Sequence, residues 1–216
     1  MSILAEIEKR AAVSLLQCVG IAAVRTEDGL REDIRTVVLL GPREPEFWLH
    51  FQQTPESCDG APDPLDRWSR RVIGGIACDL GAKAVFPFGG PPYRPFLAWA
   101  LRSGQCWTSP VGLLVHEMAG LFISFRGAIA LTEVIDARAA VQPCLTCQAQ
   151  PCRTACPVGA LTPGGYDVPR CHAYLEMEPG QICMTQGCAV RRACPVGQAS
   201  RVAAQSAFHM RAFHPL

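Results

Sequence analysis

The clustering of cysteines constrains this chain more than any other feature of its sequence. Of its 12 cysteines, eight lie between residues 144 and 194, and the other four are scattered over the first 106 residues. In a secreted protein so many cysteines would indicate a disulfide framework. The first 20 residues lack the order of a signal peptide, because charged side chains interrupt their apolar positions. We therefore expect a cytoplasmic protein whose clustered thiols bind metal.

Two similar cysteine runs make up the cluster, and each ends in the pentapeptide ACPVG, at 155–159 and at 193–197. The first run is C-x2-C-x4-C-x3-C-P, and the second is C-x4-C-x5-C-P with one further cysteine before it. Bacterial two-cluster ferredoxins use C-x2-C-x2-C-x3-C-P, in which the fourth cysteine binds the other cluster. The first run matches this pattern except for a middle gap that is two residues longer. The pattern predicts two [4Fe–4S] clusters in a ferredoxin-type domain over 141–200.

Crossed ligation assigns all eight cysteines to these two clusters. A short run can surround three corners of a cluster, whereas Cys156 lies a turn beyond Cys152 and points toward a neighbouring site. The first cysteine group is then Cys144, Cys147, Cys152 and Cys194. The second cysteine group is Cys156, Cys171, Cys183 and Cys188. No cysteine of this region is left over, which is the main internal argument for two clusters.

Other interpretations of the cysteine runs stay open at this point. Four thiolates also bind structural zinc, but zinc sites usually consist of two paired C-x2-C motifs. Only Cys144 and Cys147 have that spacing. A thioredoxin-like use of the same pair would require a βαβ setting, which the surrounding sequence does not suggest. The long x4 gaps leave room for one cluster that is incomplete or labile.

The sequence before residue 141 mixes helical and strand patterns, which favours a layered α/β (α+β) domain over 1–140. Predicted helices cover 3–17, 63–82 and 94–104, and predicted strands cover 21–25, 36–40 and 83–88. An apolar hairpin is predicted within 111–135, with its turn at Met118-Ala119-Gly120 and a third strand after it. Beyond residue 140 only 171–177 has a helical pattern before the tail, and 201–216 is predicted as a helix or tail.

Charge and hydropathy exclude some partners. The formal net charge is +1 and charged residues make up 18% of the chain, so there is no basic surplus for binding nucleic acid. No stretch approaches the ~18 uninterrupted apolar residues that would span a bilayer. We therefore expect no membrane partner.

The cysteine block, with RCHAYLEME (170–178) between its two runs, resembles the C-terminal iron–sulfur region of epoxyqueuosine reductase. Relatives of that family include corrinoid-dependent reductive dehalogenases. The resemblance extends upstream in the family's order, through DRWSRRV (66–72), AVFPF (84–88), RPFLAWALRSGQCW (94–107) and VGLLVHEMAGLFISFRGAIAL (111–131). It implies a first domain related to flavin nitroreductases that holds cobalamin beside two electron-delivering clusters. It also implies a modified tRNA base as substrate, so tRNA stays open as a partner.

The sequence departs from this family where the chemistry would take place. The position of the family's acidic proton donor falls near Gly90, within FGGPP (88–92), where no carboxylate stands. The family's glycine-lysine-asparagine turn is replaced by Thr108-Ser109-Pro110. A general acid must lie within hydrogen-bond reach of the proton that it donates. We therefore expect the scaffold of the family without its known reaction.

Three functions follow from the sequence. The first is an electron-transfer protein with two [4Fe–4S] clusters that delivers electrons to a partner protein or to a cofactor in its own first domain. The second is a corrinoid- or flavin-dependent reductase, and the third is a non-redox protein whose cysteines hold a structural metal. The sequence identifies no catalytic residue, no cobalamin or flavin ligand, no redox partner and no oligomeric state. His116 is interpreted as a residue of a solvated or hydrogen-bonded turn. The scattered cysteines are interpreted as ordinary small residues in or near a core, and no role is assigned to them, namely Cys18, Cys58, Cys78 and Cys106.

Overall fold

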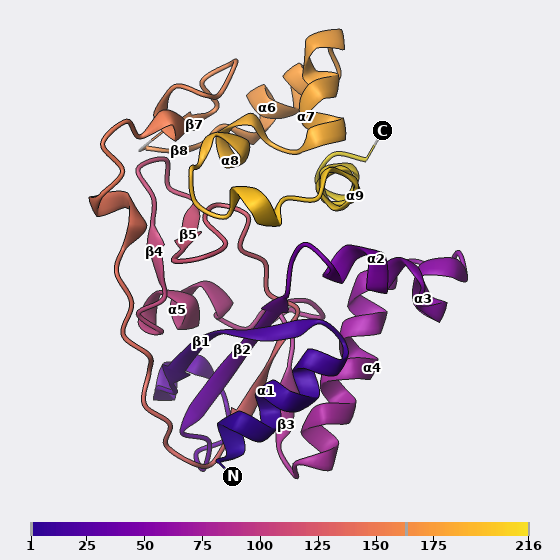
Figure 1. Cartoon of the computed structure of the whole chain (residues 1–216), viewed down its shortest axis with the longest axis vertical. Helices are drawn as coiled ribbons and strands as arrows, with labels where there is room; N and C mark the ends of the chain where they lie inside the picture. Colours follow the sequence, from indigo (N-terminus) through magenta and orange to yellow (C-terminus); the bar gives the residue numbers. More distant parts are fainter. Residues whose placement is uncertain (1, 163, 216) are drawn as a thin grey trace. The chain divides into compact units, whose positions relative to one another are not determined.

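The structure is a computed structural model that describes residues 2–162 and 164–215. The chain forms two compact units of mixed helix and strand, so the mixed α/β class is confirmed (Figure 1). One unit comprises Met1–Cys106 and Ser124–Ala140, and the other comprises Trp107–Ile123 and Val141–Leu216. The unit with the clustered cysteines thus includes 107–123, a segment within the predicted range 1–140.

The first unit is built on a four-stranded antiparallel sheet with the order β1-β2-β6-β3. Its strands are β1 (Leu16–Ala23), β2 (Thr36–Pro42), β6 (Gly127–Leu131) and β3 (Lys83–Val85). Every residue of β2 and β6 is buried, which explains their continuous rather than alternating apolar sequences. The predicted strands over 21–25, 36–40 and 83–88 are therefore confirmed, with shifted ends.

Five helices surround this sheet: α1 (Ile3–Val13), α2 (Phe47–Gln52), α3 (Pro55–Cys58), α4 (Pro64–Asp79) and α5 (Phe96–Arg102), with a 3-10 turn at Thr26–Asp28. Helices α1 and α5 pack on β1, and α4 packs on β3 and β6. The core includes Trp68 of α4, whose ring meets Phe47 at 5.3 Å and Phe51 at 6.1 Å between centroids. Helices α2 and α3 were not predicted, since each is at most six residues long.

Helix α4 matches its prediction closely. Pro64 occupies the first turn, where its missing N–H removes no helical hydrogen bond. The helix continues through Gly74 and Gly75 and ends where Gly81 adopts a left-handed φ of +63°. The N–H of Gly81 donates to the Cys78 carbonyl at 3.1 Å, which satisfies one of the last carbonyls of the helix.

The second unit consists of short elements. It has two two-stranded sheets, one of β4 (Cys106–Thr108) with β5 (Leu114–His116) and one of β7 (Leu161–Thr162) with β8 (Gly165–Tyr166). Its helices are α6 (Val168–Leu175), α7 (Gln181–Gln186), α8 (Ala189–Ala193) and α9 (Ala203–Phe213). Its 3-10 turns are Pro143–Leu145, Pro151–Arg153, Glu178–Gly180 and Gln198–Ser200.

Two sequence predictions for this unit need correction. The apolar hairpin is present only as a turn: β5 pairs with the preceding β4, and a bridge joins His116 to Gly120. The described residues 121–126 then form no strand before β6. The expectation of one helix between residue 141 and the tail was also wrong, since the short helices α7 and α8 carry too few residues for a periodic pattern. The predicted C-terminal helix is confirmed by α9.

None of the helices in the described part of the chain is long and apolar enough to cross a lipid bilayer.

Candidate metal centre

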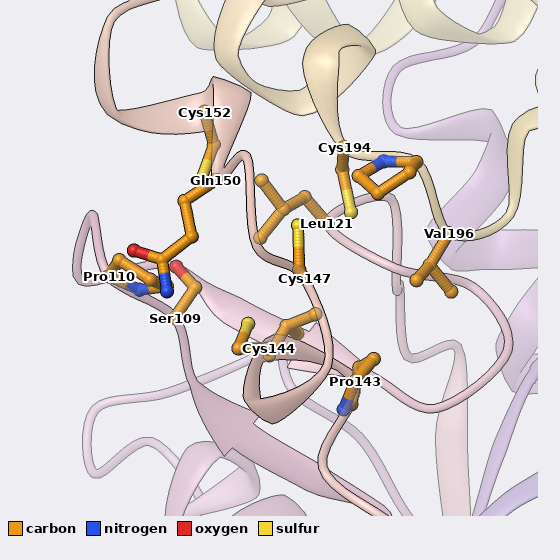
Figure 2. A pocket seen from close by; sticks show the side chains of 12 residues that line it. Ser109, Pro110, Leu121, Pro143, Cys144, Cys147, Gln150, Cys152, Cys194 and Val196 are labelled. Atoms are coloured by element: carbon orange, nitrogen blue, oxygen red, sulfur yellow. The ribbon is translucent and has the colours of Figure 1, made fainter.

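The first cysteine group lines a single pocket in the second unit (Figure 2). None of the lining side chains carries a fixed charge, and only Ser109 and Gln150 add polar groups besides the thiols. Val115 and Leu121, each 1% exposed, form part of the apolar wall. The remaining lining residues are Pro110, Pro143, Pro195 and Val196. The pocket therefore offers sulfur donors in surroundings that contain no carboxylate competitor.

Local backbone geometry brings the first three thiols of this group to the pocket. Cys144 and Cys152 each lie in a 3-10 turn that begins with a proline. Between the two turns, the chain bends at Gln148 and Ala149, and Gln150 adopts a left-handed φ of 37°. The two additional residues of the middle gap thus belong to a turn, and they do not displace the third cysteine from the pocket.

The fourth thiol, that of Cys194, reaches the same pocket from the end of α8. It lies against Gly120, where an added Cβ would be 3.1 Å from the Cys194 sulfur and 2.5 Å from the Val196 carbonyl oxygen. Gly120 has a φ of +58°, a conformation that glycine adopts without strain. The turn at Gly120 therefore packs directly on the second Cys-Pro run, and glycine is the residue that permits this approach.

The thiols of the first group influence one another electrostatically. Burial raises the pKa of Cys144, and the neighbouring thiols of Cys152, Cys194 and Cys147 raise it further. Burial also raises the pKa of Cys152, with further contributions from Cys194 and Cys147. Four thiolates in such a pocket repel one another unless a cationic group lies between them, so these thiols can all ionise together only when metal binds.

The second cysteine group is brought together from α6, α7, the start of α8 and the loop before β7. Cys183 is buried beside Leu175 and Met184, and the other three cysteines are partly buried. Burial raises the pKa of Cys171, and the thiols of Cys188, Cys156 and Cys183 add to this shift in that order. The other three members therefore lie within electrostatic reach of Cys171.

Two hydrogen bonds end on sulfur atoms of the second group. The Tyr166 hydroxyl donates to Sγ of Cys171 at 3.1 Å, and the backbone N–H of Ala160 donates to Sγ of Cys156 at 3.2 Å. The sequence analysis did not identify Tyr166, because a tyrosine five residues before a cysteine is no recognisable motif.

Two arginines accompany the cysteine groups and were also not identified from the sequence. Arg191 donates through Nη1 to the Leu121 carbonyl at 2.6 Å and lies in the electrostatic field of Cys188. Arg201 donates to the backbone carbonyls of Arg192 and Cys194. Arg191 thus accompanies the second group, and Arg201 accompanies the first, where Arg153 also lies in the electrostatic field of Cys152. For Arg191, the Arg191-Arg192 pair between the last two cysteines was the available sequence signal.

A single metal ion does not fit the thiols as they stand. Within residues 2–162 and 164–215, no group of three or more His, Cys, Asp or Glu side chains is arranged to hold a metal ion. Four thiolates on one zinc ion would bring their sulfur atoms within about 4 Å of each other, because a Zn–S bond is about 2.3 Å long. In Figure 2 the four sulfur atoms are instead spread around the pocket. Four cysteine thiols are the donor set that iron–sulfur clusters use, and the pocket supplies them without a competing carboxylate.

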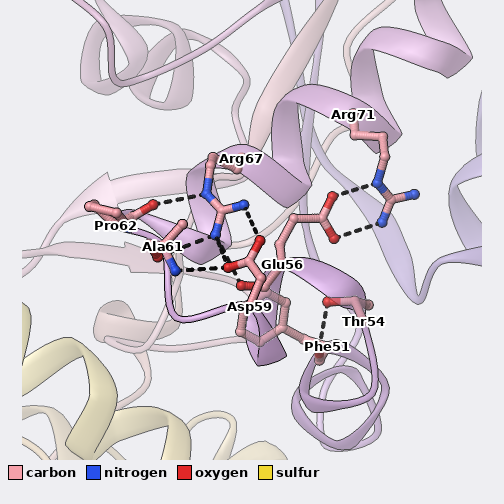
Figure 3. Close-up of polar contacts among 8 residues, drawn as sticks. All are labelled: Phe51, Thr54, Glu56, Asp59, Ala61, Pro62, Arg67 and Arg71. Atoms are coloured by element: carbon pink, nitrogen blue, oxygen red, sulfur yellow. Dashed lines mark hydrogen bonds and ion pairs between the residues drawn. The ribbon is translucent and has the colours of Figure 1, made fainter.

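The carboxylates near the start of α4 pair with arginines (Figure 3). Asp59 accepts two hydrogen bonds from Arg67, both at 2.7 Å, and these lower the pKa of Asp59. Glu56 is largely buried and accepts two hydrogen bonds from Arg71, which lower the pKa of Glu56. These carboxylates stabilise the local fold and offer no proton donor in place of the one missing near Gly90.

Other residues considered from the sequence have ordinary surroundings. Nδ1 of His116 accepts hydrogen bonds from the backbone N–H groups of Met118 and Ala119, both at 3.1 Å, which confirms its place in a hydrogen-bonded turn. Burial raises the pKa of Cys18 to about 11, and its thiol lies 3.7 Å from the Gly20 carbonyl oxygen. The four scattered cysteines all belong to the first unit, and none of them lines the pocket.

Comparisons of this chain with models of protein families, with curated proteins and with solved structures found no match.

Proposed function

We propose that this chain is an iron–sulfur electron-transfer protein with two [4Fe–4S] clusters, one held by each cysteine group. The observation that carries the proposal is the pocket of the first group. Four thiols from sequence positions 50 residues apart, 144 to 194, line one uncharged hollow. The mutual electrostatic influence of the second group's thiols supports a second site of the same kind.

In this proposal a bound [4Fe–4S] cluster supplies reversible one-electron transfer. The chain's own residues hold the cluster and control its surroundings. The thiols lose their protons as metal enters, so cluster uptake releases protons. Val115 and Leu121 keep water from one wall of the first site, since both are buried there. Arg191 and Arg201 provide positive charge beside the thiolate ligands.

Metal analysis of the protein purified or reconstituted without oxygen tests this proposal. We expect about eight iron atoms per chain, four for each of two clusters, with a broad visible absorption that bleaches when dithionite is added. A protein that contains zinc alone would overturn the proposal and favour the non-redox alternative with a structural metal.

Serine variants show whether the iron depends on the two cysteine groups. Cys147→Ser removes one thiol of the first group, and we expect the iron content to fall by about half, because one of two clusters is lost. Cys183→Ser tests the second group in the same way. Cys78→Ser is the matched control, since Cys78 is an exposed cysteine of the first unit, and we expect its iron content to equal that of the wild type. Equal iron in all three variants would contradict the ligand assignment.

The relation to epoxyqueuosine reductase is a second proposal. It comprises a nitroreductase-like first domain that holds cobalamin or flavin, a ferredoxin-like second domain and a cytoplasmic location. The separate mixed α/β unit before the cysteine region supports it. Titration with cobalamin and with FMN, followed by absorption, tests it, and we expect a saturable spectral shift with one of the two. Absence of binding of both would leave electron transfer to a partner protein as the function.

A further inference from the structure

The two cysteine groups differ in the hydrogen bonds that their sulfur atoms accept. The second group accepts one from the Tyr166 hydroxyl and one from the Ala160 N–H. For the first group, the described residues provide no corresponding hydrogen bond to a cysteine sulfur, and apolar side chains such as Leu121 line its pocket instead. The nearby arginines do not create this difference, because Arg191 and Arg201 donate to backbone carbonyls and not to sulfur.

Tyr166 is fixed as a donor to Cys171. Its ring stacks on Phe213 of α9, with centroids 5.9 Å apart and an angle of 12° between the rings. A tyrosine hydroxyl has an ordinary pKa of about 10, so it carries a proton to donate at neutral pH. The Ala160 N–H is a backbone group and is always a donor.

Hydrogen bonds to ligand sulfur change the ease with which an iron–sulfur cluster is reduced. Reduction adds one negative charge to the cluster and its thiolates. A donor that points at a ligand sulfur interacts more strongly with the more negative, reduced state. Such hydrogen bonds are among the features that set the reduction potential of a cluster. A group with two donors on its sulfur atoms should therefore have a higher potential than a comparable group without them.

We propose that the cluster of the second cysteine group has the higher reduction potential of the two, and that Tyr166 is a positioning residue that raises it. The proposal rests on the proposed two-cluster function. An electron that a low-potential one-electron donor gives to the first cluster then passes to the second. The first cluster is oxidised again and the second is reduced by that same electron. The second site becomes the place where the electron resides before it leaves the protein.

A redox titration followed by paramagnetic resonance tests this proposal in wild type, Tyr166→Phe and Tyr174→Phe. Tyr174 is the matched control, because its hydroxyl donates to the Pro179 carbonyl at 3.1 Å and not to a sulfur atom. We expect Tyr166→Phe to lower the reduced-to-oxidised ratio of the second cluster by about tenfold at a fixed potential. For a one-electron couple this equals about 59 mV. Tyr174→Phe should leave both potentials unchanged.

Single-cluster proteins assign the two signals. Cys147→Ser retains the second group and Cys183→Ser retains the first, and we expect the higher potential in Cys147→Ser. A higher potential in Cys183→Ser than in Cys147→Ser would overturn the proposal. This test holds even if Tyr166→Phe fails to bind its second cluster. An unchanged second potential in Tyr166→Phe would overturn the role of Tyr166. A wild-type protein without any iron–sulfur signal would overturn the proposed function, and this inference with it.

Discussion

The two units of this protein reach their folded state by different means. In the first unit, fully buried strands and the aromatic side chains around Trp68 form an extensive apolar core. In the second unit, short helices and turns surround small apolar clusters, and cysteine side chains are members of both. A chain segment with little apolar surface to bury folds stably only with another source of free energy, such as bound metal. Under the proposed function, we therefore expect the first unit to fold by burial of apolar surface and the second unit to require bound metal.

Removal of metal gives the largest expected contrast between the units. Under the proposed function, extraction of iron under anaerobic, reducing conditions should unfold α6, α7 and α8, because each of these helices carries or directly follows a thiol of the second group. The strands β2 and β6 should keep their protection. Hydrogen exchange of the protein with and without iron measures this protection directly. Equal protection of α7 in the two forms would show that the fold of the second unit does not depend on metal.

A cavity in the aromatic core should destabilise the first unit and leave the metal of the second unit in place. Trp68 is 1% exposed, so Trp68→Ala removes a large buried ring and should destabilise the first unit by about 3–5 kcal/mol. The cysteine groups are in the other unit, so the iron content should not change. Urea unfolding followed by circular dichroism gives the free energy, with Tyr93→Ala as an exposed control that should have little effect. Loss of iron from Trp68→Ala would show that the second unit depends on the first.

The turn at Gly120 tests packing around the first cysteine group. Gly120→Ala places a Cβ 2.5 Å from the Val196 carbonyl oxygen, so the backbone must shift, at a cost of about 1–3 kcal/mol. Gly112→Ala is the matched control: its φ of +77° is also left-handed, but its nearest neighbour would be 4.0 Å away. Thermal unfolding of the iron-loaded proteins should therefore show a larger decrease in melting temperature for Gly120→Ala than for Gly112→Ala. Equal decreases in melting temperature for the two variants would mean that the left-handed backbone conformation alone accounts for the destabilisation.

The sequence predicted helix α4 and strand β2 near their observed positions. Helix α4 has a proline in its first turn and a glycine just beyond its end, and β2 is a continuous apolar run. The four cysteines of the first group were also predicted as a set, and the structure places them around one pocket. Their role as ligands stays a prediction.

Long-range packing explains what the sequence did not reveal. The apolar pattern of 111–135 is compatible with a hairpin, but Gly120 contacts Val196, which lies far away in the sequence. A local pattern contains no information on such a contact. Arg191 was missed for the same reason, because its partner Leu121 is also distant in the sequence. Tyr166 is close to Cys171 in the sequence, but its spacing from the cysteine matches no recognisable motif.

Alkaline pH should weaken the first unit through Cys18. Its pKa is about 11 in the folded protein, against an ordinary value of 9.0, mainly because the thiol is buried. A raised folded pKa contributes stability that is complete below the ordinary value and is lost as the pH rises to about 11. The unfolding free energy should therefore fall over this range by up to about 2 kcal/mol. Cys18→Ala should remove this part of the pH dependence, whereas Cys78→Ala, which alters an exposed thiol, should retain it. The same decline in Cys18→Ala would assign the effect to other groups.

The smallest expected effect is a gain in stability that is confined to the first unit. Gly75 lies on the exposed side of α4, and an added Cβ would meet no atom within 4 Å. Glycine in a helix interior is less favourable than alanine by about 0.5–1 kcal/mol, because it loses more backbone freedom on folding. Gly75→Ala should therefore raise the unfolding free energy by about this amount, as measured by urea unfolding, and leave the iron content unchanged. A decrease in the unfolding free energy would mean that α4 requires glycine at this position for a contact made outside the first unit.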